Sequence, residues 1–253
     1  MKLTQKHSNN YSKNGYIIIP QAISKEDIIS LQKAILAMVK KYFPSENDKP
    51  LSELLFMLEE KDHSLVYNIH KTMSTSAIAN KIISNFDLNI IHSQLYNIPV
   101  ENIHAHLFQT PCQFPGNKNF DFSWHQESGS YGKDYSKILT CWFPILGKVN
   151  SERGSTEIIP KTHLQGIRET KHIIYDSGLN DWVVTPAKEE LESAVVVELE
   201  VGDVLLFDSN LIHRSVSNIS NTVRITGIAR TIDICALNEI KVMAEPVNYL
   251  SHN

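Results

Sequence analysis

A change in sequence texture near residue 103 constrains how this chain can fold more than any other feature. Before it, apolar residues recur at helical spacing. After it, apolar segments of roughly eight residues alternate with Gly, Pro and Asn, which is typical of an antiparallel sandwich or jelly roll. Because strands and helices do not alternate, we predict a mainly β protein with flanking helices. A largely helical region over residues 1–100 would pack outside a double-stranded β-helix, a cupin-like jelly roll, over residues 101–235.

Local signals define several elements. The apolar segment Tyr16–Ile19 precedes a proline and predicts a strand. Ser24 as N-cap and Asp27 at the third helical position predict a helix, whose apolar stripe continues to Tyr42 and which Pro44 ends. Further helices are expected over Leu51–Leu58 and Ser76–Phe86, and strands over Ile103–Phe108, Ile138–Phe143, Ala194–Leu199, Val204–Phe207 and Val223–Thr231.

Length and composition exclude several classes of protein. A chain of 253 residues suits one β-rich domain, so we expect residues 1–253 to form a single domain. The formal net charge of -4 and the lack of dense basic segments argue against a nucleic-acid partner. Three widely spaced cysteines suggest neither a disulfide framework nor a thiolate zinc site. With no apolar segment in Met1–Asn14 and none long enough to span a bilayer, we expect a cytoplasmic protein without membrane contact.

The segment Trp124-His-Gln-Glu127, followed far downstream by His213, predicts a metal site. Two imidazoles and one carboxylate on one face of a mononuclear iron(II) leave the other positions open for a cosubstrate and oxygen. Residues two apart on a strand point to the same side, so His125 and Glu127 would face the barrel interior and Gln126 would face away. A His-x-Glu pair also arises by chance in a chain with 11 histidines, and its alternative interpretation is a surface polar pair.

Two residues beyond His213 suggest what binds beside the metal. Arg224 lies among strand-forming residues, where burying its charge is costly unless a carboxylate accompanies it. The carboxylate of 2-oxoglutarate is such a partner, because guanidinium binds carboxylates with two parallel hydrogen bonds. Ser215 is two residues past His213 and would donate a hydrogen bond to the same carboxylate. The alternative for Arg224 is an ion pair with an acidic residue of the chain.

Several motifs in the same order resemble the phytanoyl-CoA dioxygenase family of iron(II)- and 2-oxoglutarate-dependent oxygenases. The resemblance extends from Tyr16 to about Thr231 and rests on more than any one motif. The matching segments are Trp124–Glu127, Trp142–Ile145, Gly154–His163, Gly202–His213 and Arg224.

The resemblance implies the double-stranded β-helix, with iron(II) on His125, Glu127 and His213. It places Ser215 and Arg224 on the distal carboxylate of 2-oxoglutarate and Trp142 near that cosubstrate. Family members place polar groups that touch cosubstrate or substrate where Gln109 lies. Glu127 departs from the family pattern of His-x-Asp, and its longer arm would shift the metal or alter how oxygen is presented.

Other candidate residues have less support. His104 and His106 would share one face of a strand, but no carboxylate or cysteine at matching spacing supports a second metal site. His163 is expected to be structural or adjacent to the substrate. Four aromatic residues are core or pocket-wall candidates: Phe108, Trp124, Tyr131 and Trp182.

The prediction is an iron(II)- and 2-oxoglutarate-dependent dioxygenase that uses O2 to hydroxylate or otherwise oxidise an unactivated C–H of a small metabolite. A role in natural-product or cell-surface sugar biosynthesis is favoured by analogy, whereas a CoA thioester is disfavoured because no basic patch would bind its phosphates. One alternative is a non-catalytic β-helix that binds a small molecule or sugar. A second is a zinc-dependent hydrolase on the same barrel. The oligomeric state stays open.

Overall fold

The protein combines helices and antiparallel sheets, as a computed structural model of the chain shows. It describes residues 3–46, 48–85, 87–117, 121–131, 137–175 and 179–237. Phe86, at the end of a predicted helix, lies outside these residues, and so do the side chains of His106 and Tyr131. Within the described part, every helix is too short or too polar to cross a bilayer.

Within the described residues the largest sheet has six strands, five of them in the order β1-β9-β4-β11-β2, each antiparallel to its neighbour. The short strand β3 pairs with the first residues of β11. Successive residues of β11 point to opposite faces of the sheet, so Arg224, Thr226 and Arg230 lie on one face and Ile225 and Ala229 on the other. The strands are β1 (Tyr16–Ile19), β2 (Ile103–Gln109), β3 (Cys112–Gln113), β4 (Ile138–Leu146), β9 (Val204–Asp208) and β11 (Arg224–Asp233).

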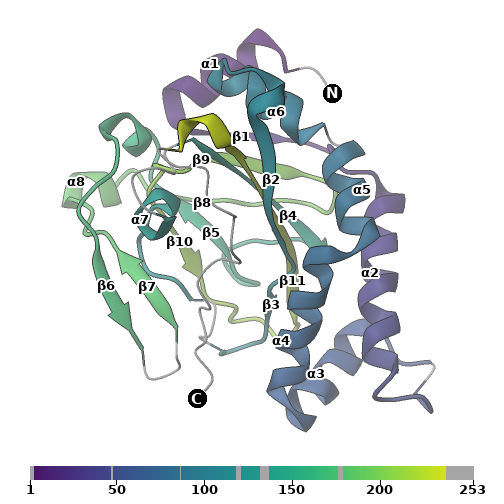
Figure 1. The fold of residues 1–253 in the computed structure, drawn as a ribbon. Helices are drawn as coiled ribbons and strands as arrows, with labels where there is room; N and C mark the ends of the chain where they lie inside the picture. The colour runs from purple at the N-terminus through teal and green to yellow at the C-terminus, as the bar shows by residue number, and fades with distance from the viewer. Residues whose placement is uncertain are drawn as a thin grey trace.

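Helices cover one face of this sheet, as Figure 1 shows for α2, α5 and α6. Leu139, Phe143 and Ile225 from that face join Leu31 and Leu54 of the helices in the main hydrophobic core. Gly227 lies on the same face. A Cβ at this position would lie 2.2 Å from Cζ of the Phe143 ring, so the ring leaves room for glycine alone. The helices are α1 (Gln5–Asn14), α2 (Lys25–Lys40), α3 (Leu51–Lys61), α4 (His63–Thr72), α5 (Ala77–Asn85) and α6 (Leu88–Tyr96).

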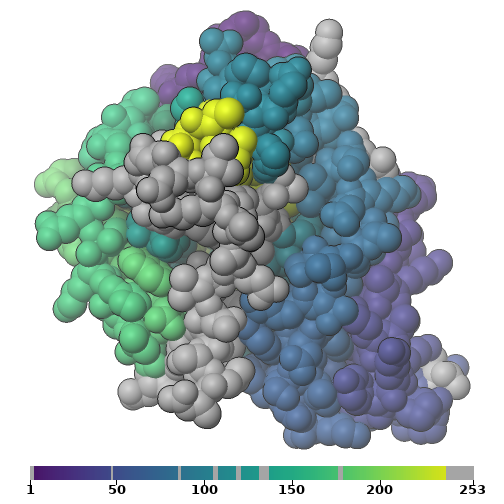
Figure 2. Space-filling model, viewed as in Figure 1, coloured from purple at the N-terminus to yellow at the C-terminus, as the bar shows by residue number. Residues whose placement is uncertain are grey.

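The other face of the sheet is approached by two smaller sheets. One has the order β10-β5-β8, and the other is the hairpin β6-β7. Figure 2 shows the helical region, purple and blue, on one side of the molecule and the green segments beyond residue 150 on the other. These elements are β5 (Ser155–Ile158), β6 (Lys171–Ile174), β7 (Asn180–Val183), β8 (Val195–Val196) and β10 (His213–Val216), with the short helices α7 (Glu127–Tyr131) and α8 (Lys188–Leu191).

Comparison with the predicted elements shows where local signals sufficed. The strand Tyr16–Ile19 and the helix capped by Ser24 have the expected starts. That helix ends at Lys40 rather than near Pro44, and Tyr42 is exposed. The predicted strand Ala194–Leu199 is wrong in length, because only Val195–Val196 pairs with β5.

Among the described helices of residues 1–100, α1, α4 and α6 were not predicted. Helix α1 is polar and buries only Tyr11, so it lacks an apolar stripe, and a capping box from Thr4 to His7 begins it instead. Helix α4 follows α3 after a single residue, Asp62, which serves as the C-cap of the first and the N-cap of the second.

Candidate active site

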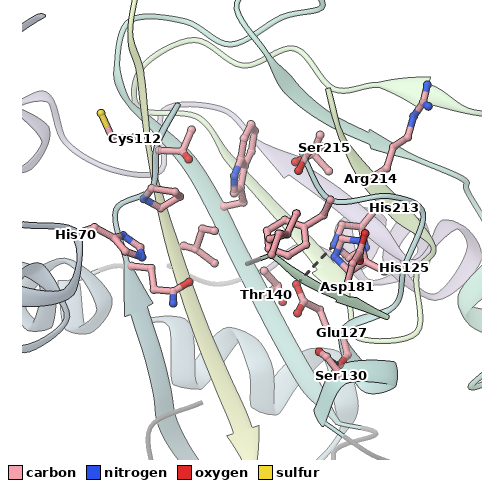
Figure 3. Close-up of a pocket in the computed structure, with 18 of the residues that line it drawn as sticks. His70, Cys112, His125, Glu127, Ser130, Thr140, Asp181, His213, Arg214 and Ser215 are labelled. Atoms are coloured by element: carbon pink, nitrogen blue, oxygen red, sulfur yellow. Dashed lines mark hydrogen bonds and ion pairs between the residues drawn. The ribbon is translucent and has the colours of Figure 1, made fainter. Parts of the chain in front are cut away.

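A cavity lies between the strands and helix α4, and its volume of about 150 Å³ is some ten times what one buried water molecule needs. Its wall combines residues of α4, the uncovered face of β4 and β11, and strands β7 and β10. Figure 3 shows His70 and Cys112 at one side and Asp181 with the two predicted metal-binding histidines at the other. All predicted site residues line this cavity: Gln109, His125, Glu127, Trp142, His213, Ser215 and Arg224.

The two histidines are held opposite each other by the backbone. The N–H of His125 donates to the carbonyl of His213 over 2.9 Å, and the N–H of His213 donates back over 3.0 Å. This reciprocal pair is an isolated antiparallel bridge. It brings the ring centroids to 4.1 Å although 88 residues separate the two positions in the sequence.

Each histidine ring is oriented by its Nδ1 atom. His125 Nδ1 lies 2.7 Å from the Ser123 carbonyl oxygen, and His213 Nδ1 lies 2.9 Å from that of Leu211. A carbonyl oxygen only accepts, so Nδ1 of each ring carries a proton, and Nε2 is the ring nitrogen left to face the cavity. Desolvation in the cavity, together with the nearby His213, lowers the pKa of His125 to about 4. Neutral imidazole is the form that binds metals.

Glu127 begins helix α7, which corrects the prediction that a strand would carry both His125 and Glu127. The intervening Gln126 faces away from the cavity, as predicted, and is fully buried. Its amide nitrogen donates to the carbonyls of Gly166 and Asn210, and its amide oxygen accepts from the Arg168 N–H. These three bonds fix the turn that brings the Glu127 carboxylate back to the histidines.

Arg230 holds the Glu127 carboxylate from the other side. Its Nη2 donates to Glu127 Oε1 over 2.5 Å, and both residues are at most 9% exposed. Burial alone would raise the pKa of Glu127, but Arg230, together with the two histidines, outweighs it and keeps the pKa well below its usual value. Glu127 is therefore an ionised acceptor in the cavity wall.

The three side chains fit an iron site of the two-histidine, one-carboxylate type. One ligand atom from each of His125, Glu127 and His213 lies within 4.8 Å of the other two. Glu127 Oε1 is 3.6 Å from His213 Nε2, and Figure 3 shows these groups pointing toward one another. Neutral imidazole nitrogens with a single carboxylate on one side are the donor set that non-haem iron(II) takes while keeping open positions.

Arg224 lies at the far end of the cavity-facing side of β11, with 4% of its surface exposed. Its Nε has no hydrogen-bond partner, and its guanidinium forms no ion pair with any described carboxylate. Burial lowers the pKa of Arg224 to about 10, which still leaves the group cationic at neutral pH. Its guanidinium carbon lies 5.9 Å from the centroid of the Trp142 ring. The expected alternative, an ion pair within the chain, is absent among the described residues.

Other predicted residues occupy clear places. Ser215 lies two residues after His213 on β10. Residues two apart on a strand point to the same side, and both line the cavity. Gln109 ends β2 opposite Ile228 of β11. His163 lies outside the cavity, where its Nε2 is 3.2 Å from the Ser12 carbonyl oxygen, so its position is structural. His104 is exposed on β2.

The three aromatic candidates whose side chains are described occupy different places. Trp182 lines the cavity and stacks on His172 of the neighbouring strand, with 4.5 Å between the two ring centroids. Phe108 belongs to the main hydrophobic core. Trp124 lies outside the cavity under the guanidinium of Arg214, 4.8 Å from its ring centroid.

Sequence reasoning missed several polar residues of the cavity. Arg230 and Thr226 share the parity of Arg224 on β11, so the two-residue period starting at Arg224 would have found both. His70 is buried on α4, a helix that was not predicted, and burial lowers its pKa to about 4. Asp181 on β7 had no local signal, because its strand is short and lies in a segment without recognisable motifs.

Comparisons with solved structures support the same type of fold. The epimerase SnoN, in complex with Fe³⁺, alpha ketoglutarate and nogalamycin RO, is 15% identical, with 90% of this chain and 83% of that chain covered and a TM-score of 0.62. The non-heme alpha ketoglutarate dependent carbocyclase SnoK from nogalamycin biosynthesis is 18% identical, with 92% and 85% covered and a TM-score of 0.57. EctD from S. alaskensis, with 2-oxoglutarate and 5-hydroxyectoine, is 17% identical, with 99% and 84% covered and a TM-score of 0.57. Identities this low show the fold alone.

Sequence comparison gives the family. No curated protein matches the chain at a significant level. The family model for phytanoyl-CoA dioxygenase (PhyH) matches residues 11–226, which is most of the chain and contains every predicted site residue. The chain belongs to the phytanoyl-CoA dioxygenase family, whose members are 2-oxoglutarate-dependent non-haem iron oxygenases that use O2.

Proposed function

We propose that this protein is an iron(II)- and 2-oxoglutarate-dependent dioxygenase that oxidises an unactivated C–H of a small metabolite. The observation that carries the proposal is a cavity with possible metal ligands at one end and a buried arginine at the other. His125, Glu127 and His213 converge at one end, and at the other the buried Arg224 forms no ion pair with any carboxylate that the structure describes. We also propose that the chain is a single domain and that its sheets form the double-stranded β-helix of the family.

The proposed roles follow from the chemistry of each group. His125, Glu127 and His213 would hold iron(II), and Arg230 would keep Glu127 in position as a carboxylate. Arg224 would bind the distal carboxylate of 2-oxoglutarate in a two-pronged manner.

Four further residues would complete the cosubstrate site. The Ser215 hydroxyl would donate to the same carboxylate as Arg224. Thr226 supports this assignment, because its buried Oγ1 has no hydrogen-bond partner in the described part of the chain and lies two residues from Arg224 on the same face of β11. Trp142 would pack against the cosubstrate below the Arg224 guanidinium, and Gln109 would contact cosubstrate or substrate.

Iron(II), 2-oxoglutarate and oxygen together supply the oxidation of a C–H bond, with loss of CO2 from 2-oxoglutarate to leave succinate. The chain supplies geometry and exclusion of water. The walls of Phe207, Trp142 and Ile228 keep the interior apolar between its polar ends. The turn at Gln126 is fixed by three backbone contacts, so the carboxylate does not depend on the metal for its position.

A small metabolite is the substrate class that the surroundings support. Two of the solved neighbours are complexes with small molecules, nogalamycin RO in one and 5-hydroxyectoine in the other. Epimerase and carbocyclase names among them indicate that hydroxylation is one of several oxidative outcomes open to this fold. A place in natural-product or cell-surface sugar biosynthesis remains our proposal, and a CoA thioester is disfavoured for lack of a basic patch.

Succinate formation tests the proposal. The iron(II)-loaded protein is expected to convert 2-oxoglutarate to succinate in the presence of oxygen, and His213→Ala to lose this conversion. Zinc-loaded protein is the control that separates the hydrolase alternative, which gives Arg224 no role. Failure of the wild-type protein to take up iron(II), with no succinate above background, would contradict the proposal and favour a non-catalytic binding protein.

A further inference from the structure

Asp181 is a carboxylate in the cavity for which the proposed iron and 2-oxoglutarate sites have no use. It lies on β7, is 1% exposed, and lines the cavity together with the metal-binding histidines. Figure 3 shows it beside His125. This position places the Asp181 carboxylate next to the metal end of the cavity, at the side of the β6-β7 hairpin.

The two oxygens of Asp181 differ in their contacts. Oδ2 accepts from the Ser123 N–H over 2.8 Å, and the carbonyl of the same Ser123 accepts from His125 Nδ1. Oδ1 is buried and has no hydrogen-bond partner among the described residues. Leaving a buried acceptor unsatisfied costs about 1–3 kcal/mol, and more when it is charged. Because Asp181 lines the cavity, a donor group on a molecule bound there would satisfy Oδ1.

The charges of the cavity indicate which kind of donor. Apart from the paired Arg214–Glu157, the described charged side chains of the wall are the cations Lys71, Arg224 and Arg230 and the carboxylates Glu127 and Asp181. Iron(II) and the 2-oxoglutarate dianion would add charges of equal size and opposite sign. The loaded cavity therefore has no excess of negative charge to attract a cationic substrate, and a neutral O–H satisfies Asp181 Oδ1 without adding charge.

We propose that Asp181 is a specificity-determining residue that accepts a hydrogen bond from a hydroxyl group of the substrate. The substrate would then be a hydroxylated metabolite, an alcohol, polyol or sugar, whose hydroxyl lies near the carbon that is oxidised. This inference deepens the proposed function and rests on it. Asp181 binds through Oδ1, while Oδ2 keeps the Ser123 peptide in place.

Matched fragments test the assignment without knowledge of the natural substrate. Cyclohexanol, its ether methoxycyclohexane and cyclohexylammonium would be titrated calorimetrically into protein loaded with iron(II) and 2-oxoglutarate, without oxygen so that no turnover occurs. We expect wild-type protein to bind the alcohol about tenfold or more tightly than the ether, because a hydrogen bond to a charged acceptor is worth about that much.

Two variants locate the preference. Asp181→Asn keeps an amide oxygen for the Ser123 N–H but presents an NH2 donor to the cavity, so the preference for the alcohol over the ether should disappear. Thr140→Val is the matched control, because it removes from the same cavity a different buried hydroxyl that has no hydrogen-bond partner among the residues described. It should leave the preference unchanged.

The outcomes are separable. No binding of the alcohol, equal binding of alcohol and ether to wild-type protein, or a preference that survives in Asp181→Asn would overturn the inference. Tighter binding of cyclohexylammonium than of cyclohexanol would mean that Asp181 selects an ammonium group and not a hydroxyl. Loss of the preference in Thr140→Val would mean that the preference does not depend on Asp181 alone, and both results contradict the inference. The prior titration with iron(II) and 2-oxoglutarate tests the proposed function separately, since its failure would appear before any fragment is added.

Discussion

Arg224 and Arg230 lie on the cavity-facing side of the same strand, β11, and both are buried, yet their surroundings differ. Arg230 Nη2 donates to Glu127 Oε1 over 2.5 Å, whereas Arg224 forms no ion pair with a described carboxylate. Six residues of strand separate their Cα atoms by about 20 Å. The difference indicates that one arginine serves the structure of the metal site and the other serves an anionic ligand that enters from outside.

The largest expected effect tests whether the Arg230 end is the metal end. His213→Ala removes one of three ligands, and we expect iron(II) affinity to fall more than a hundredfold. Losing a residue that only supports a ligand already costs ten- to a hundredfold. Equilibrium titration with iron(II) measures this, and His163→Ala, outside the cavity, is the control. Equal iron(II) affinity in His213→Ala and wild type would mean that the metal does not bind at this end of the cavity.

Arg230→Met should destabilise the metal-free protein by about 3 kcal/mol or more, because it leaves the Glu127 carboxylate buried without its cation. Chemical denaturation measures the free energy of unfolding. The double variant Glu127→Gln with Arg230→Met should recover part of the loss, since the uncompensated charge is gone. A single variant as stable as the wild type would mean that the pair has no structural role.

Arg224→Gln should behave differently from Arg230→Met. Among the described residues no carboxylate loses an ion-pair partner, so the metal-free protein should keep its stability, while the dissociation constant for 2-oxoglutarate rises at least thirtyfold. That factor corresponds to about 2 kcal/mol for removing one side of a buried charge pair. Calorimetric titration gives the constant. Unchanged 2-oxoglutarate affinity would break the comparison between the two arginines.

The opposite face of β11 predicts a pH effect that involves neither arginine. His92 is fully buried, with Nδ1 2.8 Å from Thr231 Oγ1, and burial, opposed in part by Asp233, lowers its pKa from 6.5 to about 4. Below pH 6.5 the unfolded chain binds a proton that the folded chain refuses, so stability falls as the pH drops toward 4.

At pH 5 this linkage amounts to about 2 kcal/mol relative to pH 7. Denaturation of the metal-free protein at several pH values measures the loss, and His92→Gln should reduce its slope between pH 6.5 and 4. An unchanged slope in that variant would assign the effect to other groups, such as the buried His70.

The smallest effect concerns the length of the carboxylate arm. Glu127→Asp shortens the reach to Arg230 and to the histidines, so we expect iron(II) affinity to fall by less than about tenfold, as for weakening one supporting contact. Iron titration and succinate formation measure it together. Equal or higher activity would show that the extra methylene is tolerated rather than required.

Local patterns predicted the residues of the cavity better than the elements that hold them. The spacing of His125, Gln126 and Glu127 correctly indicated which side chains face inward, but a strand and a turn into a helix satisfy that spacing equally. The bridge between His125 and His213 depends on a contact between segments far apart in the sequence, which no local pattern encodes. The family motifs substituted for that missing information.

The partners of the site were harder to predict than its ligands. Arg230 was hidden because a buried arginine is interpretable only when its carboxylate is known, and Glu127 lies 103 residues away. Asp181 is distinguished by an oxygen without a partner, which is a property of packing and not of spacing. Helix α4, which supplies one wall of the cavity, begins directly after α3 and has no separate start signal apart from Asp62.

Anaerobic titration of the iron(II)-loaded protein with 2-oxoglutarate tests the central claim most directly, with the charge-transfer absorption of the iron–keto acid chelate as the readout. The account predicts saturable appearance of this absorption with one 2-oxoglutarate per chain, its loss in His213→Ala, and a much weaker midpoint in Arg224→Gln. Absence of the absorption in wild-type protein, or an identical midpoint in Arg224→Gln, would contradict it.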